Sequence, residues 1–244
     1  MSQSEYFDAQ EFSPSALVND ILTEDSAAQA FVEGYGHELR FCHSSGRWYR
    51  WNGQIWKPDE THAAFHWARQ LARRLSEDFD NETRKRVGKR SFAGGVESFA
   101  QRDPAVAVTI SNWDADPWLL GTPKGTVDLR TGKLQPSDPK DYITKSVLVA
   151  PDSTECVRWR QFLNEASGGD VGLVNFLQVW CGYALTGVTT EHALAFVHGL
   201  GMNGKSVFLN TTTRIFGDYA AVASMDTFVA STNDRHPTDL AMLR

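Results

Sequence analysis

The sequence is poor in cysteine, with three in 244 residues, at Cys42, Cys156 and Cys181. They are isolated and odd in number, which excludes the paired spacing of a zinc site and the cysteine density of a disulfide framework. No apolar run approaches the ~20 residues of a membrane span, and the acidic, polar first residues lack the basic-then-apolar layout of a signal peptide. We therefore expect a protein of the reducing cytoplasm, without a membrane partner.

The sequence also lacks an excess of positive charge, because its net charge is −6. The protein as a whole does not attract nucleic acid, so any DNA contact requires a local basic patch. Arg84, Lys85, Arg86, Lys89 and Arg90 form one such patch, with five basic residues in seven positions. This run is either a loop that contacts phosphates, with salt-dependent binding, or a solvated connection, and the sequence leaves both open.

Hydrophobic residues make up 41% of the chain and charged residues 22%, a globular balance that allows one large domain or two modest ones. Helical and strand patterns both occur, so the predicted fold class is α/β, after a mobile tail at residues 1–24. Residues 106–111 are predicted as a short helix or a strand, and Asp170 as a helix N-cap. The predicted helices are 24–35, 63–79, 92–101, 156–165 and 171–185, and the predicted strands are 39–42, 47–51, 54–56, 125–129, 133–135 and 146–150.

An aromatic hairpin is predicted where Asn52-Gly53 separates two aromatic-rich arms, because both turn positions favour positive φ. Trp48, Tyr49, Trp51 and Trp56 lie on these arms. Exposed rings there would stack on unpaired bases. The alternative is that at least one face of the hairpin packs on the domain core, as aromatic pairs in sheets commonly do.

The most specific pattern is a glycine-rich loop at residues 199–206, with the form G-x-x-x-x-G-K-[ST]. It follows an apolar run at 193–197, predicted as a strand covered on both faces, and it precedes a helical pattern that ends at Gly217. Glycines allow backbone N–H groups to cradle phosphates, and the helix N-terminus adds a favourable dipole. The predicted nucleotide-binding residues are Gly199, Gly201, Met202, Asn203, Gly204, Lys205 and Ser206.

Two side chains of this loop have expected roles. Lys205 would neutralise the β- and γ-phosphates of ATP, and Ser206 would bind Mg²⁺ through the nucleotide. The alternative is a chance match in a turn that happens to contain glycine.

Four segments together resemble the phage and plasmid primase–helicase family, which also includes the poxvirus primase-helicase. They are residues 125–132 (GTVDLRTG), 141–144 (DYIT), 176–187 (FLQVWCGYALTG) and 201–206 (GMNGKS). Residues 236–240 (HPTDL) are similar to the family segment that lies just upstream of the Walker B strand.

The resemblance implies an accessory α/β domain with hairpins and helices at residues 25–150, and a helical lead-in at 151–187. Residues 188–244 would then be the first part of a superfamily III helicase domain, a partial AAA+-like P-loop NTPase. It also implies ATP and Mg²⁺ as cofactors, single-stranded or forked DNA as partner, and a hexameric homo-oligomer when the protein is full length. The cell would be a bacterium or a phage-infected host.

The sequence departs from the family pattern in ways that leave the catalytic residues unknown. Walker B carboxylates, the polar sensor, the arginine finger and the primase domain have no counterpart in these 244 residues, so little ATP turnover is expected. Two alternatives to a helicase fragment stay open: a non-catalytic module that docks DNA or subunits, and a small-molecule kinase, which would need an arginine-bearing lid.

Overall fold

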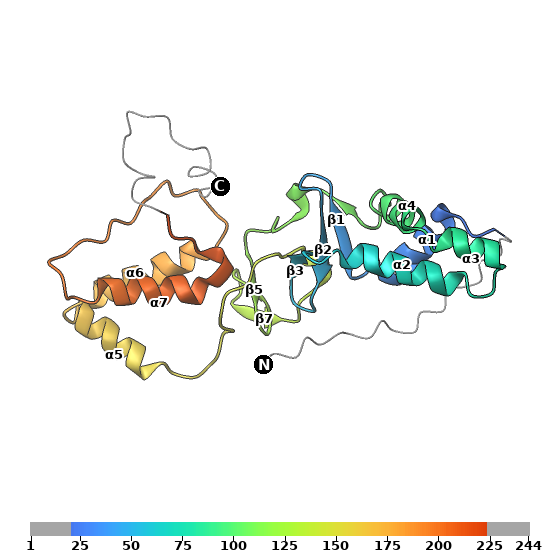
Figure 1. Ribbon diagram of the computed structural model, residues 1–244. Helices are drawn as coiled ribbons and strands as arrows, with labels where there is room; N and C mark the ends of the chain where they lie inside the picture. Colours follow the sequence, from blue (N-terminus) through green and yellow to red (C-terminus); the bar gives the residue numbers. More distant parts are fainter. Residues whose placement is uncertain (1–20, 224–244) are drawn as a thin grey trace, which may run out of the picture. The chain divides into compact units, whose positions relative to one another are not determined.

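The computed structural model describes residues 21–223, which form two compact units that meet in sequence between Trp113 and Asp114 (Figure 1). Both units combine helices with an antiparallel hairpin, so the predicted α/β class is confirmed. The unit boundary lies inside the region 25–150 that the resemblance treats as one domain. The physical reason is that one hydrophobic cluster ends at Val106 and a separate one begins at Leu120.

The N-terminal unit packs helices against one face of a small sheet (Figure 1). Its sheet has the strand order β3-β2-β1-β4, with β4 parallel to β1 and the other neighbours antiparallel. The helices are α1 (Glu24–Tyr35), α2 (Ala63–Leu75), α3 (Asn81–Val87) and α4 (Arg90–Ala100), and the strands are β1 (Leu39–Cys42), β2 (Arg47–Trp51), β3 (Trp56–Pro58) and β4 (Ala107–Val108).

The first turn of α1 is fixed by a capping box. The Thr23 hydroxyl accepts the N–H of Ser26 at 3.1 Å, and the Ser26 hydroxyl accepts the N–H of Thr23 at 3.0 Å. Such a cap contributes about 1 kcal/mol. Leu22, next to it, is buried in the core. The ordered unit therefore includes residues 22–24, which the sequence assigned to a tail, whereas residues 1–20 lie outside the described residues.

The helix predicted over 63–79 is shorter than its apolar seam. α2 ends at Leu75 because the Ser76 hydroxyl donates to the carbonyl of Arg73 at 2.8 Å, and the chain then turns. Asp80 starts the next helix by accepting the N–H of Thr83 at 2.8 Å. Leu75 and Phe79 still pack on the core from both sides of this turn. The spacing of the apolar residues therefore predicts which side chains are buried, but it does not predict where the helix ends.

The aromatic hairpin is confirmed, but its turn is longer than predicted. Trp51 pairs with Trp56, so the loop spans residues 52–55. The Asn52 side-chain oxygen accepts the N–H groups of Gln54 and Ile55, both at 2.9 Å, and only Gly53 has positive φ, at 90°. The Asn-Gly pair thus marks the position of the turn correctly, but the asparagine side chain stabilises a four-residue loop and not a two-residue turn.

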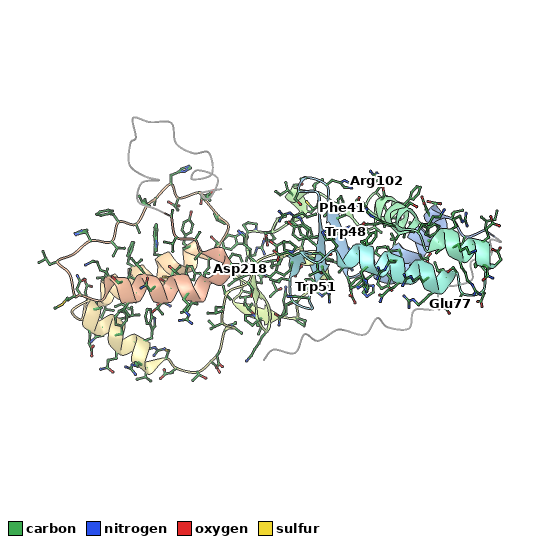
Figure 2. All side chains as sticks on the ribbon, in the orientation of Figure 1. Phe41, Trp48, Trp51, Glu77, Arg102 and Asp218 are labelled. Atoms are coloured by element: carbon green, nitrogen blue, oxygen red, sulfur yellow. The ribbon has the colours of Figure 1, made fainter. Side chains whose placement is uncertain are left out.

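Aromatic rings cover both faces of this sheet. On the helical face, Trp48 packs edge-on against Phe41, with ring centroids 5.2 Å apart, and Figure 2 labels both residues. On the other face, Tyr49 lies 4.5 Å from Trp113, and the Arg40 guanidinium lies 5.0 Å from the ring of Trp56. The tryptophans of the hairpin therefore serve packing.

The C-terminal unit begins with the sheet β5-β6-β7, made of β5 (Leu119–Thr122), β6 (Gly125–Asp128) and β7 (Lys133–Gln135). Its second hairpin joins β6 to β7, which correspond to the strands predicted at 125–129 and 133–135. Gly125 is required there, because its φ is +144° and a side chain would meet the carbonyl oxygen of Gln135 at 2.2 Å.

The strand predicted at 146–150 does not form. Val147 donates to the carbonyl of Gly121 and Leu148 donates to that of Ile215, both at 2.9 Å, but no ladder continues from these bonds. Val147 is buried, whereas Leu148 and Val149 are about half exposed. The apolar run is thus an irregular segment anchored by one buried side chain.

Three helices follow: α5 (Val157–Ala166), α6 (Val171–Ala184) and α7 (Lys205–Phe216). Asp170 caps α6 as predicted, because its side chain accepts the N–H of Leu173 at 3.0 Å. No residue of these three helices is buried. Within residues 21–223, no helix has the length and apolar character needed to cross a bilayer.

Candidate functional site

The glycine-rich loop has the left-handed backbone that its sequence requires. Gly201 and Gly204 have φ of +84° and +83°, Gly199 has +155°, and Met202 adopts +48°. Glycine takes these conformations without a Cβ penalty, whereas Met202 is strained there. Helix α7 begins directly after the loop, at Lys205, so the N–H groups of its first turn point out of the helix end.

Lys205 lies across the loop that precedes it. Its ammonium nitrogen donates to the carbonyl oxygen of Gly199 at 3.0 Å and to the side-chain oxygen of Asn203 at 2.7 Å. A Cβ on Gly199 would approach the Asn203 side-chain nitrogen to 2.5 Å and the Lys205 ammonium to 3.1 Å. A side chain at position 199 would therefore displace the Asn203 amide or the Lys205 ammonium group from their observed positions.

Helix α5 packs against the end of the loop. A Cβ on Gly204 would lie 3.0 Å from both the Phe162 ring and the Ala166 methyl group. Trp159 stacks on Phe162 at 5.1 Å and on Phe208 of α7 at 6.0 Å. This contact holds the start of α7 against α5, so the position of Lys205 depends on α5 as well as on the loop.

The remaining predicted residues of the loop face solvent. Gly201, Met202, Asn203 and Ser206 are exposed, and Lys205 is partly covered. Ser206 lies in the first turn of α7, beside the lysine. Chemically, the loop offers a cation, backbone N–H groups and a hydroxyl around one position, which is the donor set for a phosphate and its magnesium ion.

The prediction of a strand at 193–197, before the loop, is wrong. Residues 192–199 form no strand, and Leu194, Phe196 and Val197 are 83%, 79% and 43% exposed. A strand buried on both faces needs a neighbouring strand on at least one edge, and no strand of residues 21–223 pairs with this segment.

The basic run is helical over most of its length, and it is not a loop. Arg84, Lys85 and Arg86 form the last turn of α3, Lys89 lies in the connection, and Arg90 begins α4. Successive helical residues point about 100° apart, so Arg84, Lys85 and Arg86 point in different directions from α3. Basic residues in a last turn also stabilise the helix through its dipole.

Two of the five cations make contacts within their own unit. Arg84 donates to the carbonyl of Glu77, and Arg86 donates to that of Leu22 at 2.6 Å. Arg86 and Lys89 also line a hollow of about 460 Å³ that contains two carboxylates, Glu24 and Asp25. The guanidinium groups of Arg84 and Arg86 are therefore held by contacts within the unit, whereas Lys85, Lys89 and Arg90 are exposed.

The aromatic hairpin offers little ring surface for a base. Trp48 and Trp56 are buried, at 6% and 0% exposure, and the Trp48 indole N–H donates to Glu97 at 2.9 Å. Tyr49 and Trp51 are half-buried. The expectation of an exposed tryptophan from this hairpin is therefore wrong for Trp48 and Trp56, because they belong to the packed sheet.

No sequence pattern singled out Glu97 as a functional residue. It is half-buried beside the start of α2, where His62 adopts a left-handed backbone with φ of +58°. Burial raises the pKa of the Glu97 carboxyl, against the Trp48 hydrogen bond and the nearby His62, which lower it. A contact between residues 48 and 97 is set by tertiary packing, so no local pattern indicates it.

Comparison with known proteins identifies a family. The sequence model described as D5 N terminal like matches residues 28–168, more than half of the chain, and the matched segment ends before the glycine-rich loop. No curated protein sequence matches the chain.

Proposed function

Because the chain belongs to the D5 N-terminal-like family, which relates it to the primase-helicase replication proteins of phages and poxviruses, we propose that it is an ATP-binding replication protein of phage or plasmid type. In this proposal residues 199–206 bind ATP and Mg²⁺ at the start of a superfamily III helicase domain. The chemistry is ATP hydrolysis coupled to DNA unwinding, by a hexameric ring in the full-length protein.

The position of Lys205 is the observation that carries the proposal. Its ammonium group is held by Gly199 and Asn203, 3.0 and 2.7 Å away, at the N-terminus of a 12-residue helix. A β- or γ-phosphate oxygen would replace these neutral acceptors with a charged one, a stronger partner for the ammonium group. Ser206, one residue on, would take Mg²⁺.

A non-catalytic role is the second candidate, and it rests on the acidic residues. Within residues 207–244 no two carboxylates are adjacent, whereas ATP hydrolysis needs carboxylates that hold Mg²⁺ and position water. The 244-residue chain would then bind ATP without turning it over. An assay that finds robust turnover, at verified mass, would reject this candidate and direct attention to Asp226, Asp234 and Asp239, which lie outside the described residues.

Calorimetric titration with ATP–Mg²⁺ tests the binding proposal. Lys205→Ala removes the cation, and we expect its affinity to fall about 10- to 100-fold, as for the loss of a charged hydrogen bond. Arg214→Ala is the matched control, because it removes an exposed cation from the last turn of the same helix. Equal affinity of the parent chain and Lys205→Ala would refute the proposal.

A further inference from the structure

A groove between α2 and α4 contains polar groups that neither the family nor the proposed P-loop explains. Its volume is about 730 Å³, and it is lined by His62, Phe65, Arg90, Ser91, Gly94 and Glu97. Grooves with a few convergent polar groups and a carboxyl of shifted pKa are typical of ligand sites.

One stripe of α4 forms a wall of this groove. Arg90, Gly94 and Glu97 are spaced i, i+4 and i+7, so they lie on one face of the helix and span about 10 Å. A Cβ on Gly94 would meet no atom within 4 Å, so the groove is open between the cation and the carboxyl. This is roughly the span from the base edge of a nucleotide to its phosphate.

The carboxyl of Glu97 is oriented by the sheet. Its Oε1 accepts the indole N–H of Trp48 at 2.9 Å, and its Oε2 accepts no hydrogen bond among the described residues. Oε2 is thus an acceptor available to a ligand in the groove. Phe65, which lines the groove from α2, supplies an aromatic surface on which a base could stack.

We propose that this groove binds one nucleotide, with its phosphate on Arg90 and Ser91, its base against Phe65, and the amino group of the base donating to Glu97. The base is one that carries an amino group. Thymine is disfavoured, because two carbonyl oxygens flank its single N–H donor and repel the carboxylate. The nucleotide comes either from a DNA strand or from the free pool.

The test uses fluorescence anisotropy with labelled dC and dT oligonucleotides of equal length, and every protein carries Lys205→Ala so that the glycine-rich loop does not contribute. We expect dC to bind about fivefold to tenfold more tightly than dT, as for one hydrogen bond to a charged group. Glu97→Gln keeps an acceptor for Trp48 and should abolish this preference. The groove and the glycine-rich loop lie in different units. A negative result for the groove would therefore not bear on the proposal that the loop binds ATP.

Gly94→Leu extends a side chain into the groove from a position where a Cβ meets no atom within 4 Å, and leucine favours the helix more than glycine does. It should lower the affinity for both oligonucleotides at least tenfold. Gly182→Leu, at an equally open helical glycine of α6, is the matched control. Competition by dCMP would assign the site to free nucleotides, and its absence to a DNA strand. Equal binding by the two leucine variants, or equal affinity for dC and dT, would overturn the proposal.

Discussion

At the scale of single residues, strained or buried groups mark both candidate sites. Met202 and His62 are non-glycine residues with left-handed backbones, and each lies at a proposed ligand position. Such conformations are uncommon and persist only when the surrounding structure enforces them. Glu97 adds a carboxyl that is half-buried against an indole. Asp114 and Tyr142 have the same left-handed backbone outside the two sites, so this conformation alone does not identify a site.

The raised pKa of Glu97 predicts how the stability of the protein depends on pH. Because burial raises its pKa above the ordinary value, the folded state binds a proton more tightly than the unfolded state does. The free energy of unfolding therefore falls as pH rises from the ordinary value through the raised one. Glu97→Gln removes this loss and keeps the acceptor for Trp48, so at pH 7 its melting temperature should exceed that of the parent by a few degrees.

Thermal unfolding followed by circular dichroism from pH 4 to 8 or thereabouts checks this sign. The difference between Glu97→Gln and the parent should shrink toward acid pH, while His62 and Asp59, which also act on Glu97, are present in both proteins. Glu77→Gln, at an exposed position labelled in Figure 2, is the control. A variant less stable than the parent at pH 7 would contradict the account of Glu97.

At the scale of helices and strands, the sequence located the elements whose ends are set locally. Helix α4 is predicted at 92–101 and occurs at Arg90–Ala100, and the strands predicted at 125–129 and 133–135 form the hairpin β6-β7. The strands predicted at 146–150 and 193–197 do not form. Both segments have the apolar composition of a strand, but neither has a pairing partner among the described residues. Strand formation depends on a neighbour that a single segment does not specify.

The helical form of the basic run changes the DNA prediction. Because Arg84 and Arg86 contact carbonyl groups of their own unit, the exposed lysines of the run, Lys85 and Lys89, should contribute most of its salt-dependent attraction. Reversing both lysines to glutamate should weaken the binding of single-stranded DNA. It should also reduce the slope of the logarithm of the binding constant against the logarithm of salt concentration, by the amount expected for about two lost phosphate contacts.

Filter binding or anisotropy between 50 and 200 mM salt or thereabouts measures this slope. Lys133→Glu with Lys140→Glu changes the net charge by the same amount at exposed positions of the other unit, so it separates a local patch from the overall charge. If the two double variants bind DNA alike, the run is a solvated connection, as the alternative interpretation holds.

At the scale of the whole chain, the family match and the glycine-rich loop come from different segments. The match ends at residue 168, and the loop begins at Gly199. The loop glycines, the helix after them and the lysine were all predictable, because local spacing sets them. The packing of Phe162 and Ala166 against Gly204 was not, because it joins segments about 40 residues apart, and the groove of α2 and α4 was missed for the same reason.

The most direct test of the central claim is to observe the loop itself while ATP binds. In protein labelled with ¹⁵N only at its 19 glycines, the amide signals of Gly199, Gly201 and Gly204 are followed by NMR, with Gly→Ala variants for assignment. We predict that they shift saturably with ATP–Mg²⁺, remain in place with AMP, which lacks the β- and γ-phosphates, and remain in place in Lys205→Ala. Loop signals that do not move at saturating ATP–Mg²⁺ would contradict the account.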